Sequence, residues 1–402
     1  MRTYRELFRV PEFGALFAAA SIQSAGGTIS GLALATLVFS ITGSALLAAL
    51  ALFGSSFAQV IGAAALLSIA DRVPPRRAMV ALSLIFTVGA VVLAIPGMPV
   101  WGMLLIIFTI GLINSVGGGV RWGLLSQIVP EDGYVLGRSV FNMSNGIMQI
   151  TGFGVGGILI ALISARHALF VSAGLFLMAA VGFRLGLSNH APRAAGRASI
   201  RQTWRVNADL WSHPLRRNVY LALWVPSGLV VGCEALFVAY APDSAGVLFM
   251  AAALGMLVGD TVTGRLLRPI WRAKLISPMR LLLAAPYLLF VVAPPMPIAV
   301  VAVAVASVGF SATLMLQERL LALVPLAVRG QALGLHSSGM LTMQAIGATV
   351  AGSIAEYLQP ATAIVVMATA SLAVTIALTP RLRVRIEAAS AENLPGSPQR
   401  ST

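Results

Sequence analysis

Charged residues are scarce in this sequence. Only 10% of its 402 residues are charged and 58% are hydrophobic, whereas a typical soluble domain carries about 25% charged residues. So few polar side chains cannot cover a water-soluble protein of this length, and we expect lipid to be the solvent for most of the chain. Because lipid offers the backbone no hydrogen bonds, and because the apolar runs are long and continuous, the expected structure is helical rather than a barrel.

Cysteine and recognisable catalytic motifs are also lacking. Cys233 is the only cysteine, which excludes an internal disulfide. The sequence contains no HExxH, CxxC, P-loop or nucleophile-elbow motif and no cluster of metal ligands. We therefore expect no enzyme activity, no metal and no cofactor. Any transport across a membrane would draw its energy from an ion or solute gradient, most simply one of protons.

Acidic residues are outnumbered by basic ones, 13 to 27. The basic residues lie in alternate loops: the N-terminal segment, 71–77, 188–214, 268–280, Arg329 and the tail contain most of them, whereas 41–44, 96–99, 241–244 and 294–297 contain none. This is the positive-inside pattern. It predicts that both termini are cytoplasmic, and it explains the net charge without a nucleic-acid partner.

Twelve apolar segments are long enough to span a membrane. They are residues 13–39, 45–70, 78–95, 100–129, 138–163, 168–187, 217–240, 245–267, 279–293, 298–324, 332–357 and 361–378. The polar, basic stretch 188–214 divides them into six and six. Trp204 and Trp211 in this stretch suggest a short helix that lies at the membrane interface. The alternative is a solvated connector.

The second half of the chain repeats the first. Residues 125–157 and 320–352 align at a constant offset, with matching residues that include Pro130 and Pro325, and Gln149 and Gln344. We therefore predict an all-α membrane protein of twelve transmembrane helices in two pseudo-symmetric six-helix bundles, 1–187 and 215–380. A cytoplasmic linker, 188–214, joins the bundles, and a disordered cytoplasmic tail, 381–402, follows. Duplicated helical bundles are typical of secondary transporters with a substrate site between the halves.

Two short segments resemble motifs of a known family. The loop after the second span contains Asp71-Arg72 and Arg76-Arg77, and the fifth span contains Gly152-Phe153-Gly154-Val155-Gly156-Gly157. On these segments the chain resembles the major facilitator superfamily over residues 5–385, particularly its bacterial drug- and siderophore-exporter branch. The resemblance implies a gating role for Asp71, Arg72 and Arg76, and export for the glycine-rich segment. Independently of any family, glycines four residues apart, as at 152/156 and 255/259, let membrane helices approach closely.

Charged residues within the predicted spans are the next candidates, because each costs roughly 2.5–3.5 kcal/mol at a helix centre. Intramembrane acids often carry protons in transporters, so Glu234 and Asp260 are candidates for proton coupling. Glu234 could instead be a structural carboxylate, and Asp260 could pair with Arg265 or Arg319 in a cytoplasmic network.

Arg121 and Glu318 occupy nearly equivalent positions in the two halves. We predict that an ion pair between them, assisted by Arg319, closes a cytoplasmic gate. The alternative is that each side chain pairs within its own half.

Uncharged polar residues in the spans could face a substrate cavity. They are Gln23, Asn142, Asn145, Gln149, His336 and Gln344. Gln149 and Gln344 could instead hold helices together. His336 can change charge near neutral pH, but its place at the start of a span suggests a wet surface.

Together these features predict a monomeric secondary transporter of the bacterial cell membrane. It would export a small, lipophilic organic molecule by proton antiport through alternating access. Proton-coupled uptake is one alternative, and a non-transporting membrane receptor or lipid scramblase is another.

Overall fold

The computed structural model describes residues 4–70, 73–190, 200–325 and 328–392. These ranges contain helices and turns but no strand. Eleven of their helical segments are long and apolar enough to cross a membrane. The predicted eleventh span is the exception: α15 (Arg329–Ala355) has 27 residues, about 40 Å of helix, but His336, Thr342 and Gln344 make it more polar than the others.

The first half of the chain forms long, continuous helices. They are the short α1 (Tyr4–Leu7), then α2 (Pro11–Thr42), α3 (Ala45–Ala70), α4 (Pro75–Leu93), α5 (Val100–Ile128), α6 (Glu131–Leu162) and α7 (Ala165–Gly186). Proline opens α2 and α4, where its missing N–H is no loss. Gly43, with φ of 65°, ends α2 in the left-handed conformation that glycine adopts readily.

The second half is built from broken helices. Its elements are α9 (Pro214–Ala235), α10 (Phe237–Tyr240), α11 (Ala245–Thr261), the π-helix η1 (Val262–Leu266), α12 (Pro269–Leu282), the 3-10 helix η2 (Ala285–Val292), α13 (Met296–Val308), the 3-10 turn η3 (Gly309–Ser311), α14 (Ala312–Ala322), α15 and α16 (Pro360–Glu392). The predicted spans seven to ten are therefore not continuous α-helices. Pro286 cannot donate a helical hydrogen bond in η2, and at Gly309 the chain packs directly on the backbone of Leu283.

The last helix continues beyond the predicted end of the second bundle. We expected a disordered tail from residue 381, but α16 runs to Glu392. Residues 381–392 contain three Arg, three Ala and two Glu, which favour helix, and they extend a helix that is already formed. Residues 393–402 of the predicted tail lie outside the described residues.

The linker contains a short helix, one of the two alternatives that the sequence left open. In α8 (Ile200–Ser212), Leu210 is fully buried and the Trp211 ring stacks on Trp224 of α9 at 5.4 Å. Trp204 is 67% exposed. One side of α8 therefore packs on the second bundle, while Trp204 is left available to a membrane surface.

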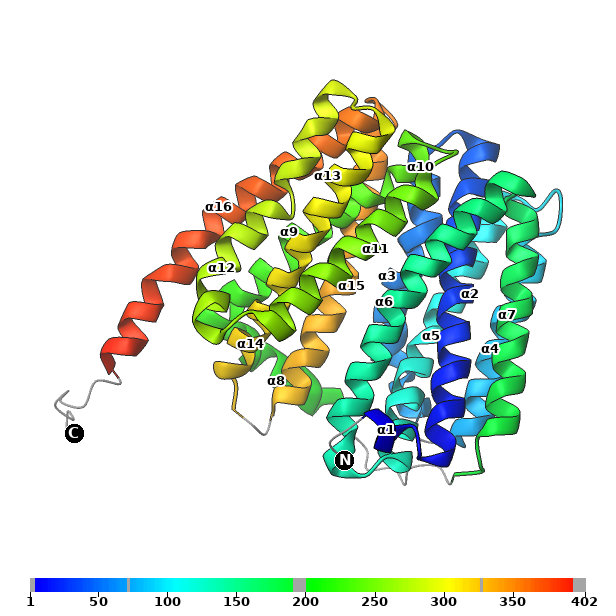
Figure 1. The fold of residues 1–402 in the computed structure, drawn as a ribbon, viewed down its shortest axis with the longest axis horizontal. Helices are drawn as coiled ribbons and strands as arrows, with labels where there is room; N and C mark the ends of the chain where they lie inside the picture. The colour runs from blue at the N-terminus through cyan, green and yellow to red at the C-terminus, as the bar shows by residue number, and fades with distance from the viewer. Residues whose placement is uncertain (1–3, 71–72, 191–199, 326–327, 393–402) are drawn as a thin grey trace.

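The helices form two bundles that meet along α3 and α15 and along α6 and α11 (Figure 1). These are the second and fifth spans of each half, and each second span meets the other half's fifth span, an exchange that is consistent with the repeat in the sequence. Figure 1 shows the bundles converging at the end that carries α10 and diverging toward α1 and α8. We call these the joined end and the splayed end.

Contacts at the joined end are very close. A Cβ atom at Gly246 would lie 2.7 Å from the Cα of Gly157, and one at Gly352 would lie 2.7 Å from the Cα of Leu46. The Phe153 ring of α6 stacks on Phe249 of α11 at 4.7 Å. The backbones of the two bundles therefore touch here, which only small residues permit.

Candidate functional site

A cavity of about 440 Å³ lies within the first bundle, between α2, α3, α4, α5 and α7. Its volume falls in the range of small-molecule sites. Much of its wall is apolar, with polar side chains from α2, α3 and α5. The polar lining residues are Gln23, Ser24, Ser30, Ser55, Gln59, Asn114 and Arg121.

Arg121 is held at the cavity wall by a chain of hydrogen bonds. Its Nη2 donates to Gln23 Oε1 at 3.1 Å, and Gln23 Nε2 donates to Ser83 Oγ at 3.1 Å. Ser83 Oγ in turn donates to the Met79 carbonyl oxygen at 3.0 Å. The guanidinium Nε is buried without a partner, and no described acid pairs with Arg121. The cavity therefore contains a positive charge that nothing in its described wall neutralises.

The predicted Arg121–Glu318 pair is not formed in this conformation. Arg121 bonds Gln23 within its own bundle, whereas Glu318 Oε1 lies 3.5 Å from Nη1 of Arg272 in α12. Arg319 Nη2 donates to the Leu382 carbonyl oxygen at 2.6 Å. Arg121, Glu318 and Arg319 thus each bind within their own half, the alternative that the sequence left open.

The two candidates for proton coupling lie in different environments. Glu234 of α9 is 5% exposed, and its Oε1 has no hydrogen-bond partner among the described residues. Cys233 and the Tyr287 hydroxyl of η2 are close enough to interact with this carboxyl electrostatically. Asp260 of α11 is exposed and has no ion pair with a described residue. Neither acid lines the cavity.

The uncharged candidates are divided among several places. Gln23 lines the cavity, and Asn145 Oδ1 accepts a bond of 2.8 Å from the cavity residue Ser24. Asn142 and Gln149 are exposed on α6, and Gln344 is half-buried on α15.

The burial of His336 differs from the prediction. We expected it at a wet surface, but it is only 6% exposed, and its Nε2 lies 2.9 Å from Gln317 Nε2. It is buried because α15 packs against α9 and α14 at its start, so a position near a helix end did not mean contact with water.

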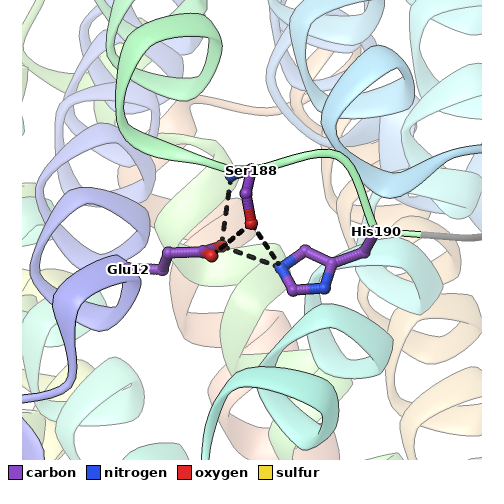
Figure 2. A network of polar contacts seen from close by, with 3 residues as sticks. All are labelled: Glu12, Ser188 and His190. Atoms are coloured by element: carbon purple, nitrogen blue, oxygen red, sulfur yellow. Dashed lines mark hydrogen bonds and ion pairs between the residues drawn. The ribbon is translucent and has the colours of Figure 1, made fainter.

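The splayed end contains two polar clusters. Asp71 and Arg72 lie outside the described residues, but Arg76 donates to the Arg184 carbonyl oxygen at the end of α7. Glu12 of α2 binds Ser188 and His190, which follow α7, with 2.9 Å between its Oε2 and His190 Nε2 (Figure 2). Both clusters fasten the end of α7 to neighbouring helices.

Glu356 joins the two bundles and was not among the residues predicted from the sequence. Its Oε1 accepts hydrogen bonds from Ser44 Oγ at 2.6 Å and from the Leu46 N–H at 3.0 Å, at the start of α3. These bonds lower the pKa of the Glu356 carboxyl below its ordinary value. No local pattern could indicate this contact, because its partners lie more than 300 residues away in the sequence.

Comparisons with known proteins agree with this architecture. Residues 16–315 match the family described as Major Facilitator Superfamily. A Bacillus subtilis (strain 168) protein, described as the uncharacterized MFS-type transporter YjbB, is 25% identical over 213 residues. That match covers 51% of this chain and 52% of the relative, so it spans about half the length of each.

Several solved transporter structures are similar in fold. A peptide transporter, POT, in complex with sulfate has a TM-score of 0.68 at 15% identity, over 92% of this chain and 94% of that one. A bacterial homolog of the human lysosomal transporter Spinster, inward-facing and occupied, has a TM-score of 0.69 at 13% identity, over 97% and 98%. The nucleoside transporter NupG has a TM-score of 0.69 at 13% identity, over 92% and 100%. Identities this low establish similarity of fold alone.

Proposed function

The chain belongs to the Major Facilitator Superfamily and is a membrane transporter, and we propose that it exports a small, largely apolar organic molecule in exchange for protons. The proposal places it in a bacterial cell membrane as a monomer, and the positive-inside pattern supports cytoplasmic termini. The joined end then faces outward and the splayed end faces the cytoplasm.

The joined end is the observation that carries this proposal. The two bundles touch through Gly157 and Gly246, through Phe153 and Phe249, and through Glu356. These contacts are at one end of the molecule, while the bundles diverge at the other (Figure 1). A cycle in which they break while others form at the splayed end would expose a central site to each side in turn. In that cycle Arg121 and Glu318, now apart, would form the predicted cytoplasmic lock with Arg319.

Glu234 is the proposed proton carrier. Its carboxyl is enclosed in the second bundle and has an oxygen without a partner among the described residues, a setting in which membrane acids commonly carry protons. The resemblance of segment 152–157 to exporters supports export over uptake. Asp260, exposed on α11, would pass protons between Glu234 and the cytoplasmic side.

Purified protein in proteoliposomes loaded with a pH-sensitive dye tests this function. We expect an amphipathic compound that is a substrate to dissipate an imposed pH gradient, and to accumulate in vesicles that are acidic inside. Glu234→Gln should abolish the proton flux. Asp209→Asn, which changes an exposed carboxyl on α8, is the matched control and should leave the flux unchanged.

Two results would contradict the proposal. Accumulation only in vesicles that are alkaline inside would indicate proton-coupled uptake. Equal movement with and without a pH gradient, in wild type and in Glu234→Gln, would indicate a passive or non-transporting protein.

A further inference from the structure

The charge of the cavity indicates a class of substrate. Arg121 lines the cavity, and its only hydrogen bond to a described residue is the one to Gln23. A guanidinium has five N–H donors, so most of its hydrogen-bonding capacity is unused. Cations inside a membrane protein are normally paired, and an unpaired charge in a site that holds substrate calls for a negative group in the substrate.

In this conformation, no acidic side chain that the structure describes takes the place of that group. Among the described side chains, none of those lining the cavity is acidic. Glu12, the described acid of α2, binds Ser188 and His190 at the splayed end (Figure 2). Glu318 and Glu356 bind partners elsewhere. Among the side chains that the structure describes, the charge of Arg121 is therefore not compensated.

Arg121 is also held in position to act as a recognition group. Gln23, Ser83 and the Met79 carbonyl oxygen form a continuous chain of hydrogen bonds from α5 through α2 to α4. This chain is built so that Gln23 presents its oxygen to Arg121 and its nitrogen to Ser83. A guanidinium fixed by one edge keeps its other donors for a carboxylate, which it matches in geometry.

We propose that the substrate is a small organic carboxylate, whose charged group pairs with Arg121 and whose apolar body lies against Phe86, Ile107 and Phe176. The apolar wall residues and the single cation together suit an amphipathic anion. This inference rests on the proposed transport function. It narrows the small, lipophilic cargo expected from the sequence to one that carries a negative group.

Binding to purified protein in phosphatidylcholine nanodiscs tests the inference without requiring transport. Three probes share one apolar body and differ in charge: phenylacetate, phenylacetamide and phenethylamine. Isothermal titration calorimetry should show that phenylacetate binds at least about tenfold more tightly than the amide. Phenethylamine should be rejected, because its ammonium group would face Arg121.

Variants locate the effect. Arg121→Gln should remove the preference for phenylacetate over phenylacetamide, and Arg121→Lys should keep part of it. Arg138→Gln is the matched control, since Arg138 is an exposed cation over the Trp122 ring and should leave the preference unchanged. The wild-type comparison of the three probes needs no variant, so it tests the preference for a carboxylate even if Arg121→Gln fails to fold.

Four outcomes would overturn the inference. They are equal or tighter binding of the amide or the amine, absence of phenylacetate binding up to its solubility limit, an unchanged preference in Arg121→Gln, and loss of phenylacetate binding when phosphatidylglycerol is added to the nanodiscs. The last would identify a lipid headgroup as the occupant. Selective binding of phenylacetate without gradient-driven flux would overturn the transport function but not this site. Proton-coupled transport of neutral compounds with no preference for anions would support the transport function but overturn the assignment of a carboxylate substrate.

Discussion

Arg280 of α12 is the largest fully buried side chain in the described structure, at 1% exposure. Its Nε, Nη1 and Nη2 atoms all lack hydrogen-bond partners among the described residues. Unlike Arg121, it does not line the cavity. The two arginines therefore differ in their surroundings. Arg121 faces a space that a ligand can occupy, whereas Arg280 is enclosed by other side chains.

The isolation of Arg280 leads to a prediction about stability. Because a buried polar group without partners costs about 1–3 kcal/mol, Arg280→Met should raise the thermal unfolding temperature of the purified protein. Tryptophan fluorescence on heating measures this temperature. Arg272→Met, on the same helix, is the control and should lower it, because Arg272 donates to the Leu267 and Gly264 carbonyl oxygens. A lower unfolding temperature for Arg280→Met would show that Arg280 is held by interactions that the fold requires.

At the scale of the helix, two glycines of α15 allow the effect of packing on stability to be distinguished from that of helix propensity. A Cβ at Gly347 would lie 1.9 Å from the Gly228 carbonyl oxygen, whereas nothing lies within 4 Å of one at Gly334. Gly347→Ala should therefore destabilise the protein by about 1–3 kcal/mol, because α9 and α15 must move apart. Gly334→Ala should be neutral or slightly stabilising, since alanine favours helix. Urea titration of the protein in mild detergent would compare the two, and equal effects would contradict the packing argument.

The positions of the helices could be predicted from the sequence, but their breaks could not. Apolar runs and turn residues locate the ends of α2 to α7 within about three residues, except that α6 begins at Glu131, seven residues before the predicted start at 138. Close packing at Gly255 was also predicted, and a Cβ there would lie 2.2 Å from the Ala304 carbonyl oxygen. Hydropathy carries no information on hydrogen-bond register, however, so the π-helix η1 and the 3-10 helix η2 were missed. Those depend on which neighbouring backbone each turn meets.

At the scale of the whole molecule, we expect Glu356 to make the contact between the bundles at the joined end depend on pH. Its hydrogen bonds to Ser44 and Leu46 lower its pKa from the ordinary 4.5. A carboxyl whose pKa is lowered in the closed arrangement stabilises that arrangement above pH 4.5. This contribution is lost as the pH falls through the lowered pKa. Glu356→Gln should mimic the loss at neutral pH and increase the open fraction roughly two- to fivefold.

Spin labels can measure this opening. Ile41→Cys and Leu358→Cys place labels at exposed positions of the two bundles beside the contact, in a Cys233→Ala background without other cysteines. Distance distributions at neutral pH should show a larger long-distance population in Glu356→Gln than in the parent. Lowering the pH should shift the distance distribution of the parent toward that of the variant. Identical distributions at both pH values would show that Glu356 does not hold the bundles together.

The candidate site was predicted only in part. The repeat in the sequence predicted two related bundles, but not that α3 meets α15 and α6 meets α11. Gln23 and Arg121 were both selected, but for separate roles, because nothing in the sequence indicates that residues 98 apart share a hydrogen bond. Intramembrane polarity identifies which side chains matter, whereas tertiary packing decides which of them meet.

The lone guanidinium in the cavity has an electrical consequence. Under the proposed exchange, a negative cargo leaves while a proton enters, so both movements carry positive charge inward. Each elementary charge that crosses is worth about 2.3 kcal/mol per 100 mV. The resting voltage of a bacterium, negative inside, would then drive both halves of the cycle, and such a carrier would keep working when the internal and external pH are equal.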